Sequence, residues 1–401
     1  MDLQKLIDRL IQMILTLLVS LGLFNAPSNM PVTQTPAIPP SVMATLTASP
    51  SPSPEPTPTP TTPTASPTLD PQSLRPEPGS VCGYDPQVEN LLGEFEQASW
   101  ASWIELLSGE KPVTINGETY TILTRYTESM FNGNPNARAY EFVFEQLREW
   151  GYREGIDLFK QEYRPKMREP KENWKNIVVL IPGNDPELAH EQVLLTAHLD
   201  SISMGNPEEH APGADDNGSG VATLLEAARV FKNLAFRRTV KIVFFSGEEL
   251  GLNGSRAYVS HYAQELHDIV GVFNLDMFGY DADNDRCFEI HVGGMPASNV
   301  IGGCLADTVE AYDLGLNFEY VVKDAITASD HATFWNEGVG AIEILENFRT
   351  DEFENGCGER DVNPHYHTEN DLIAYMNLET GHAIAKAAIA AAARMAEPFR
   401  D

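Results

Sequence analysis

Short apolar runs and longer amphipathic stretches alternate along the chain from about residue 88 to its end. The short runs are rich in β-branched and aromatic residues, which is typical of buried strands. They predict strands at 176–181, 193–197, 240–245, 269–275, 287–292, 318–322 and 341–345. Helical spacing predicts helices within 88–107, 138–150, 218–234, 255–266, 306–312 and 378–396. This alternation predicts one α/β domain, a three-layer α/β/α sandwich around a mostly parallel central sheet.

Histidine and carboxylate residues follow several of these runs at the point where each predicted strand ends. His198 and Asp200 follow 193–197, and residues two apart on an extended chain project to one face, so Asp200 can orient His198. Further candidates follow later strands or lie in loops: Asp215 in the Gly-rich turn 212–220, Glu248, Glu249, Asp276 and His367. Because parallel strands end at one edge of a sheet, the pattern predicts a site above that edge.

The candidate residues have the chemistry of a metal site. Imidazole and carboxylate side chains without thiolates suit zinc, and manganese and cobalt also accept such ligands. Hydrolysis of an unactivated amide near neutral pH requires a nucleophilic water, a polarised carbonyl and a proton shuttle. Two metal ions and one carboxylate supply all three, so the pattern favours metal-assisted hydrolysis.

Six motifs occur in a fixed order along the chain. They are His198-x-Asp200, Gly213-Ala214-Asp215-Asp216-Asn217-Gly218-Ser219-Gly220, Gly247-Glu248-Glu249-x-Gly251, Asn274-x-Asp276, Ser329-Asp330-His331 and His367-Thr368-x-x-Asp371. Together they resemble the motif series of the family M28 zinc aminopeptidases. The resemblance covers roughly residues 95–397 and includes Leu123-Thr124-Arg125-Tyr126.

The resemblance implies an aminopeptidase with two zinc ions that acts on peptides with a free N-terminus. It implies that His198 and Asp276 bind one zinc ion, that Glu249 and His367 bind the other, and that Asp215 bridges both. The His-Thr-x-x-Asp pattern selects His367 rather than the nearby His365.

The same resemblance implies the roles of residues that do not bind metal. Glu248 would be the general base for a metal-bridging water, and Asp200 would hold His198 in its ligating orientation. The family also has a cis peptide bond after its bridging aspartate, which the resemblance places between Asp215 and Asp216.

Three other functions stay open on the sequence. A glutaminyl cyclase shares this fold and several motifs but uses one zinc ion. A related carboxypeptidase would need a basic pocket for the substrate carboxylate, for which Arg256 and Arg349 are the candidates. A receptor-like or adhesive relative would keep the fold and lose catalysis, although every expected catalytic position is filled here.

The chain has three parts by composition. Residues 1–25 predict a signal peptide or N-terminal anchor, because the apolar run 10–24 follows Lys5 and Arg9 and is shorter than the ~20 residues of a full span. Residues 26–80 predict a disordered Pro/Ser/Thr-rich linker, since 25–80 holds 16 of the 28 prolines and no aromatic residue. Residues 81–401 form the expected metallopeptidase domain. The protein is then secreted or held at the cell surface, with membrane contact only through an uncleaved N-terminal segment.

Charge and cysteine content limit which binding partners and which cellular compartment are possible for this protein. The formal net charge is −31, and residues 1–80 contribute 3 basic and 5 acidic side chains, so about −29 belongs to the folded part. Nucleic acid is excluded as a partner because phosphate binding needs a basic surface. The four cysteines, at positions 82, 287, 304 and 357, lack metal-type spacing. In an exported protein they predict two disulfides in any of three pairings, and buried free thiols are the alternative.

Overall fold

The computed structural model describes residues 75–166, 170–348 and 357–399. The predicted signal peptide or anchor and the predicted linker up to residue 74 therefore lie outside the described residues. Among the helices that are described, none is long and apolar enough to cross a membrane.

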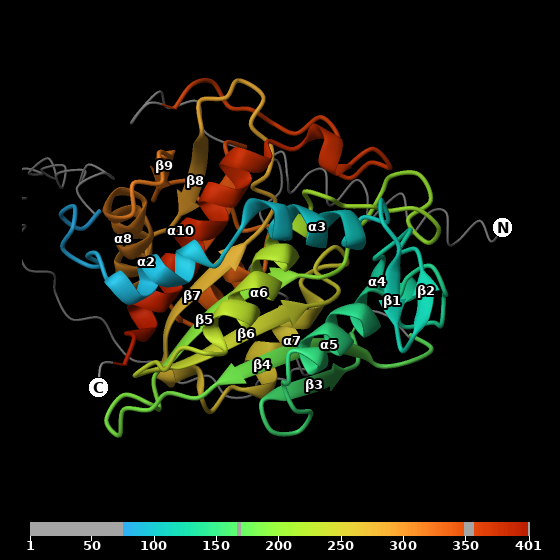
Figure 1. Cartoon of the computed structure of the whole chain (residues 1–401), viewed down its shortest axis with the longest axis horizontal. Helices are drawn as coiled ribbons and strands as arrows, with labels where there is room; N and C mark the ends of the chain where they lie inside the picture. Colours follow the sequence, from blue (N-terminus) through green and yellow to red (C-terminus); the bar gives the residue numbers. More distant parts are fainter. Residues whose placement is uncertain (1–74, 167–169, 349–356, 400–401) are drawn as a thin grey trace, which may run out of the picture. The chain divides into compact units, whose positions relative to one another are not determined.

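An eight-stranded sheet forms the centre of the described domain (Figure 1). Its strands run in the order β3 (Leu158–Tyr163), β4 (Trp174–Ile181), β6 (Thr239–Phe245), β5 (Gln192–His198), β7 (Ile269–Leu275), β10 (Ala341–Glu346), β8 (Cys287–His291) and β9 (Asn317–Val321). The four middle strands β6, β5, β7 and β10 are mutually parallel, whereas β4 and β8 flank them antiparallel. The carboxyl ends of the four middle strands thus meet at one edge.

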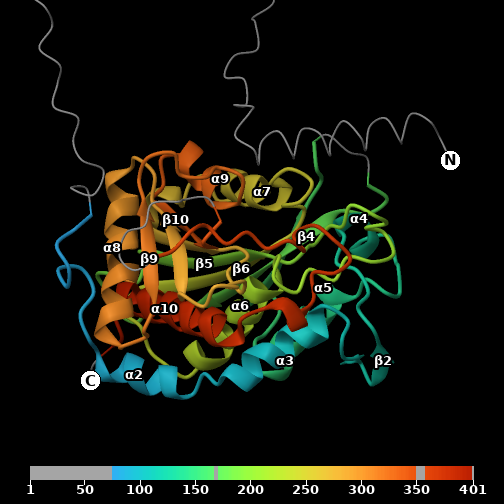
Figure 2. The same ribbon diagram turned by 90° about the horizontal axis from the view of Figure 1, so that it is seen from above.

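Helices cover both faces of this sheet, as Figure 2 shows. One face carries α6 (Gly218–Phe231), α8 (Pro296–Ala311) and α10 (Leu378–Ala396), with α3 (Gln97–Leu107) packed on α6. The other carries α7 (Asn253–His261) and α9 (His331–Asn336). The remaining elements are α2 (Pro86–Gly93), α4 (Thr127–Met130), α5 (Ala139–Glu149), the hairpin β1 (Val113–Ile115) and β2 (Glu118–Tyr120), and the 3-10 turns η2 (Leu266–Asp268) and η3 (Ile373–Tyr375). The predicted three-layer α/β class is confirmed.

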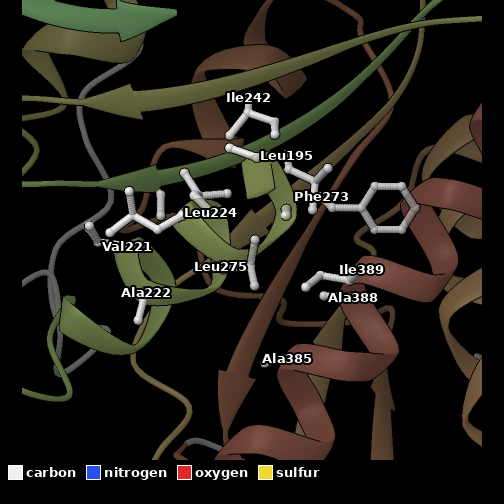
Figure 3. Close-up of a cluster of buried hydrophobic side chains, with 14 of the residues drawn as sticks. Leu195, Val221, Ala222, Leu224, Ile242, Phe273, Leu275, Ala385, Ala388 and Ile389 are labelled. Carbon is white, nitrogen blue, oxygen red and sulfur yellow. The ribbon is translucent and has the colours of Figure 1, made fainter. Parts of the chain in front are cut away.

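The core follows from the alternation of side chains along each buried strand. Leu195 of β5 points to the layer of α6 and α10, and its neighbour Leu194 packs in the separate cluster on the other face. Figure 3 shows Leu195 and Phe273 meeting Leu224 of α6 and Ile389 of α10. Many buried positions of α10 are alanines, and their small side chains allow the helix to pack close to the sheet.

Several elements differ from the predicted pattern, among them the following. The predicted helix 88–107 is two helices, α2 and α3, separated where the buried Phe95 turns into the core. Strand β3 was not predicted, because Lys160 and Glu162 are exposed on this edge strand and leave too few apolar positions to mark it. The short helix α9 was also not predicted, since six residues are too few to reveal a helical period.

All four cysteines are paired. Cys82 bonds to Cys304 of α8, and Cys287 of β8 bonds to Cys357. The structure thereby selects one of the three possible pairings and excludes free thiols.

Candidate metal centre

The candidate side chains lie where neighbouring strands end. His198 is the last residue of β5, Asp276 follows β7 directly, and Glu248 and Glu249 lie in the turn after β6. His367 comes from the loop before α10. Parallel pairing of β6, β5 and β7 places the first four residues at the same edge.

Asp216 lies at the centre of this group. Its Oδ1 is 3.3 Å from Nε2 of His198, and its Oδ2 is 3.1 Å from Nε2 of His367. Nε2 of His198 is also 3.0 Å from Oδ1 of Asp276, and Nε2 of His367 is 3.0 Å from Oε2 of Glu249. Two histidine–carboxylate pairs therefore share one carboxylate.

The structure corrects the prediction for Asp215. Its carboxylate faces away from both histidines: Oδ1 accepts the amide hydrogen of Gly279 at 2.7 Å, and Oδ2 accepts from Nδ2 of Asn363 at 3.0 Å. Adjacent residues of a loop point in different directions, so only one of two neighbouring aspartates can face the cluster. The cis peptide bond likewise lies one residue later than predicted, between Asp216 and Asn217.

The loop that carries Asp216 is fixed where helix α6 begins. Asn217 caps this helix, because its Oδ1 accepts from the amide of Gly220 at 2.9 Å. Its Nδ2 donates to the carbonyl of Leu275 at 2.8 Å, next to Asp276. A Cβ at Gly220 would lie 2.3 Å from Asn217 Oδ1, so this contact requires glycine.

Glu248 lies beside the histidine–carboxylate cluster. Ligand atoms of His198, Glu248 and Glu249 lie within 4.8 Å of one another. Burial raises the pKa of Glu248 well above its usual range, and the neighbouring Glu249 adds to this shift, whereas His198 opposes it. Glu248 therefore holds a proton more readily than a free carboxylate does.

Asp200 contacts the site in a different way from the one predicted. Nδ1 of His198 lies 3.0 Å from the backbone oxygen of Asp200 and 3.8 Å from its carboxylate. The carboxylate instead accepts from Oγ1 of Thr127 at 2.8 Å and from the amides of Glu248 and Glu249, each at 3.3 Å. The main chain of Asp200 orients His198, and its side chain holds the Glu248–Glu249 turn.

The carboxylates of the cluster raise the pKa of both histidines. Burial alone would lower the pKa of His367, but Glu249 and Asp216 outweigh burial and raise it to about 10. The pKa of His198 is likewise raised well above its usual range, because Asp276 and Glu248 outweigh burial. Among the described residues, no lysine or arginine forms an ion pair with these carboxylates.

This arrangement fits a pair of metal ions. Two groups of three side chains each hold their ligand atoms within 4.8 Å: His198, Asp216 and Asp276, and Asp216, Glu249 and His367. Within the described part of the chain, Oε1 of Glu249 is buried and has no hydrogen-bond partner. A buried carboxylate oxygen is normally paired, so a cation here would satisfy it. Nitrogen and oxygen donors without thiolates match zinc.

Several contributors had no predicted role. Thr127 and Asn363 hold the carboxylates of Asp200 and Asp215 and lie outside the strand-end pattern that marks the candidates. His365 stacks on Tyr375 with ring centroids 3.8 Å apart, which leaves His367 as the histidine beside Asp216.

The fold and this cluster define an α/β protein with a candidate metal centre, and comparison with known proteins gives the family. Residues 176–392, more than half of the chain, match the model of peptidase family M28. The chain belongs to this family, which confirms the resemblance seen in its motifs.

Individual relatives and solved structures match different shares of the chain. Leucine aminopeptidase 1 of Trichophyton equinum is 31% identical over 218 residues, which are 51% of this chain and 53% of the relative. The chain thus spans about half the length of the curated relatives it matches. Among solved structures, the LapA aminopeptidase of Legionella pneumophila has a TM-score of 0.61 at 22% identity, with 80% of this chain and 75% of that one covered. A glutaminyl cyclase of Macrostomum lignano has a TM-score of 0.57 at 16% identity, with coverages of 79% and 94%. At these identities the structures share the fold alone.

Proposed function

We propose that this chain is an exported aminopeptidase that uses two zinc ions to remove N-terminal residues from peptides. The observation that carries the proposal is the position of Asp216, whose two oxygens face His198 and His367 separately. One shared carboxylate between two histidine–carboxylate pairs supports two neighbouring metal sites rather than one.

His198 and Asp276 would hold one zinc ion, Glu249 and His367 the other, and Asp216 would contact both. When bound, the zinc ions supply Lewis-acid activation of a water molecule and of the scissile carbonyl. The backbone oxygen of Asp200 accepts a hydrogen bond from Nδ1 of His198, which leaves the lone pair of Nε2 to bind metal.

Glu248 is the general base in this proposal. Its carboxylate would take a proton from the attacking water and return it to the leaving amine. Asp200 keeps Glu248 in place because its carboxylate accepts the amide hydrogens of Glu248 and Glu249. The turn thereby divides its two glutamates, one for proton transfer and one for metal.

Family membership and the named relatives support a peptide with a free N-terminus as substrate. Family membership implies peptide cleavage, and the name of the Trichophyton equinum relative specifies aminopeptidase action for that protein.

An oxidising compartment fits the two disulfides. Together with the predicted signal peptide or anchor, they support a secreted or surface-held enzyme.

Hydrolysis of a matched peptide panel tests the proposal. Peptides with free N-termini are compared with the same peptides N-acetylated, with zinc supplied and Glu248→Ala as background. We expect cleavage of the free peptides only, abolished by the substitution.

Other outcomes would support the alternatives. Ring closure of N-terminal glutamine peptides without hydrolysis would indicate a glutaminyl cyclase. Cleavage that requires a free C-terminus would indicate a carboxypeptidase, for which the exposed Arg256 would be tested, whereas Arg349 lies outside the described residues. No turnover of any peptide would favour a non-catalytic relative.

A further inference from the structure

The loop that presents Asp216 is bound on its amide side by Asp371. Oδ1 of Asp371 accepts the amide hydrogen of Asp215 at 3.1 Å, and its Oδ2 accepts that of Asp216 at 3.0 Å. The backbone oxygen of Asp371 accepts from the amide of Ala214 at 3.0 Å. Asp371 is 2% exposed, so water does not compete for these bonds. Three consecutive amides of the loop thus end on one buried residue.

The same loop is bound on its carbonyl side by Arg125, which is fully buried. Nη1 of Arg125 donates to the carbonyl of Pro212, and its Nη2 donates to that of Gly213 at 2.8 Å. Its Nε donates to the carbonyl of Leu199 at 2.8 Å, and Nη1 also reaches the carbonyl of Leu107 at 3.1 Å. A guanidinium with its donors in a fixed fork can bind several carbonyls at once, which the single ammonium of a lysine does less well.

We infer that Asp371 and Arg125 are positioning residues for the metal centre, which set the place of Asp216 between His198 and His367. The inference rests on the proposed function, because it assigns these residues to the metal site proposed there. Neither side chain contacts a histidine of the site. Both act through the backbone of residues 212–216.

Asp371 and Arg125 also connect the loop of Asp216 to the segments that carry the two histidines. Asp371 lies in the segment that carries His367, four positions earlier, while Arg125 binds Leu199, the neighbour of His198. A shift of the loop would therefore change the distance from Asp216 to one histidine or to both. Space for such a shift is small, since a Cβ at Gly213 would lie 2.9 Å from Nη2 of Arg125 and 2.2 Å from the backbone oxygen of Asp216.

The test compares Asp371→Asn with Asp307→Asn in the full chain. Asp307 offers the same chemistry away from the site: it is 3% exposed and accepts the amides of Gly79, Val81 and Cys82 at 2.7, 2.9 and 3.0 Å. Zinc affinity is measured by competition with a chromophoric chelator, the visible spectrum of the cobalt-substituted protein reports ligand geometry, and thermal unfolding is recorded for each variant.

We expect both substitutions to lower the unfolding temperature, and Asp371→Asn alone to weaken zinc binding by ~10–100-fold and to change the cobalt spectrum, as loss of a group that orients ligands does. Unchanged affinity and spectrum in folded Asp371→Asn would overturn the inference and leave the proposed function standing. A wild-type protein that binds no zinc would overturn both.

Arg125→Lys keeps the positive charge and loses the guanidinium group that binds several carbonyls at once. This variant replaces Asp371→Asn in the test if Asp371→Asn does not fold. A ~10–100-fold loss of zinc affinity in Arg125→Lys supports the positioning role, and wild-type affinity in this variant overturns it.

Discussion

Asp215 and Asp216 are neighbours in the chain, yet their carboxylates face different parts of the molecule. Asp216 faces two histidines, whereas Asp215 accepts from the main chain of Gly279 and from Asn363. One residue of the pair therefore belongs to the cluster and the other holds the loops around it.

The different surroundings of the two carboxylates predict different effects for the same substitution at the two positions. Asp216→Asn should weaken zinc binding by more than the ~10–100-fold that is typical of residues outside the ligand set. Asp215→Asn should retain zinc and lose ~1–3 kcal/mol of unfolding free energy, because buried hydrogen bonds are weakened. Zinc affinity and urea unfolding of both variants check this. Equal zinc loss in the two would contradict the assignment.

Glu248→Gln should separate proton transfer from metal binding. The amide cannot accept a proton from water, so kcat should fall by ~10²–10⁴-fold while the zinc content stays that of the wild type. Steady-state kinetics with metal analysis on the same samples checks both numbers. Glu249→Gln is the matched control and should lose zinc as well. A Glu248→Gln enzyme with normal kcat would remove Glu248 as the general base.

The two disulfides should contribute unequally to stability. Replacing both cysteines of a pair by serine should cost ~2–5 kcal/mol in unfolding free energy. The Cys82–Cys304 bridge spans 222 residues and the Cys287–Cys357 bridge spans 70, so chain entropy predicts about 1 kcal/mol more for the first. Urea unfolding of the two double variants gives the comparison, and a larger loss for the shorter loop would show that entropy does not dominate.

Matched isoleucines test the core. Ile242 is fully buried under α6, whereas Ile156 is 56% exposed. Ile242→Ala should cost ~2–5 kcal/mol through lost burial and the cavity left behind. Ile156→Ala should change unfolding free energy by less than ~0.5 kcal/mol. Similar losses from the two would contradict the described packing of the sheet.

His382 should make the domain sensitive to acid. Burial, with a smaller contribution from Lys386, lowers the pKa of His382 to about 4 from its ordinary 6.5. In the unfolded chain His382 takes up a proton near pH 6.5, whereas in the folded protein it does so only near pH 4. The contribution of neutral His382 to the unfolding free energy is therefore full above pH 6.5 and is lost as the pH falls to about 4. His382→Gln should lose less stability over this window, as thermal unfolding at several pH values would show. An identical pH dependence in both proteins would reject the role of His382.

Much of this architecture can be predicted because the signals are local. The apolar runs that form β5, β6 and β7 are visible in the sequence, and parallel strands bring their carboxyl ends together, which locates His198 and Asp276. The boundaries of α10 follow from its apolar spacing after the capping Asn377.

What the sequence could not provide depends on contacts between distant segments. Whether Asp215 or Asp216 faces the histidines depends on Asp371, whose carboxylate holds the loop from more than 150 positions away in the chain. The cysteine pairing and the edge strand β3 likewise depend on which segments become neighbours. The residue pattern within one segment does not show which distant segments it contacts.

The most direct measurement is the rate of peptide hydrolysis as zinc is added back to metal-free protein. We expect that a peptide with a free N-terminus is cleaved, that activity reaches its maximum at two zinc ions per chain, and that the N-acetylated peptide stays intact. Full activity at one zinc ion per chain, or equal cleavage of the acetylated peptide, would contradict a two-metal aminopeptidase centred on Asp216.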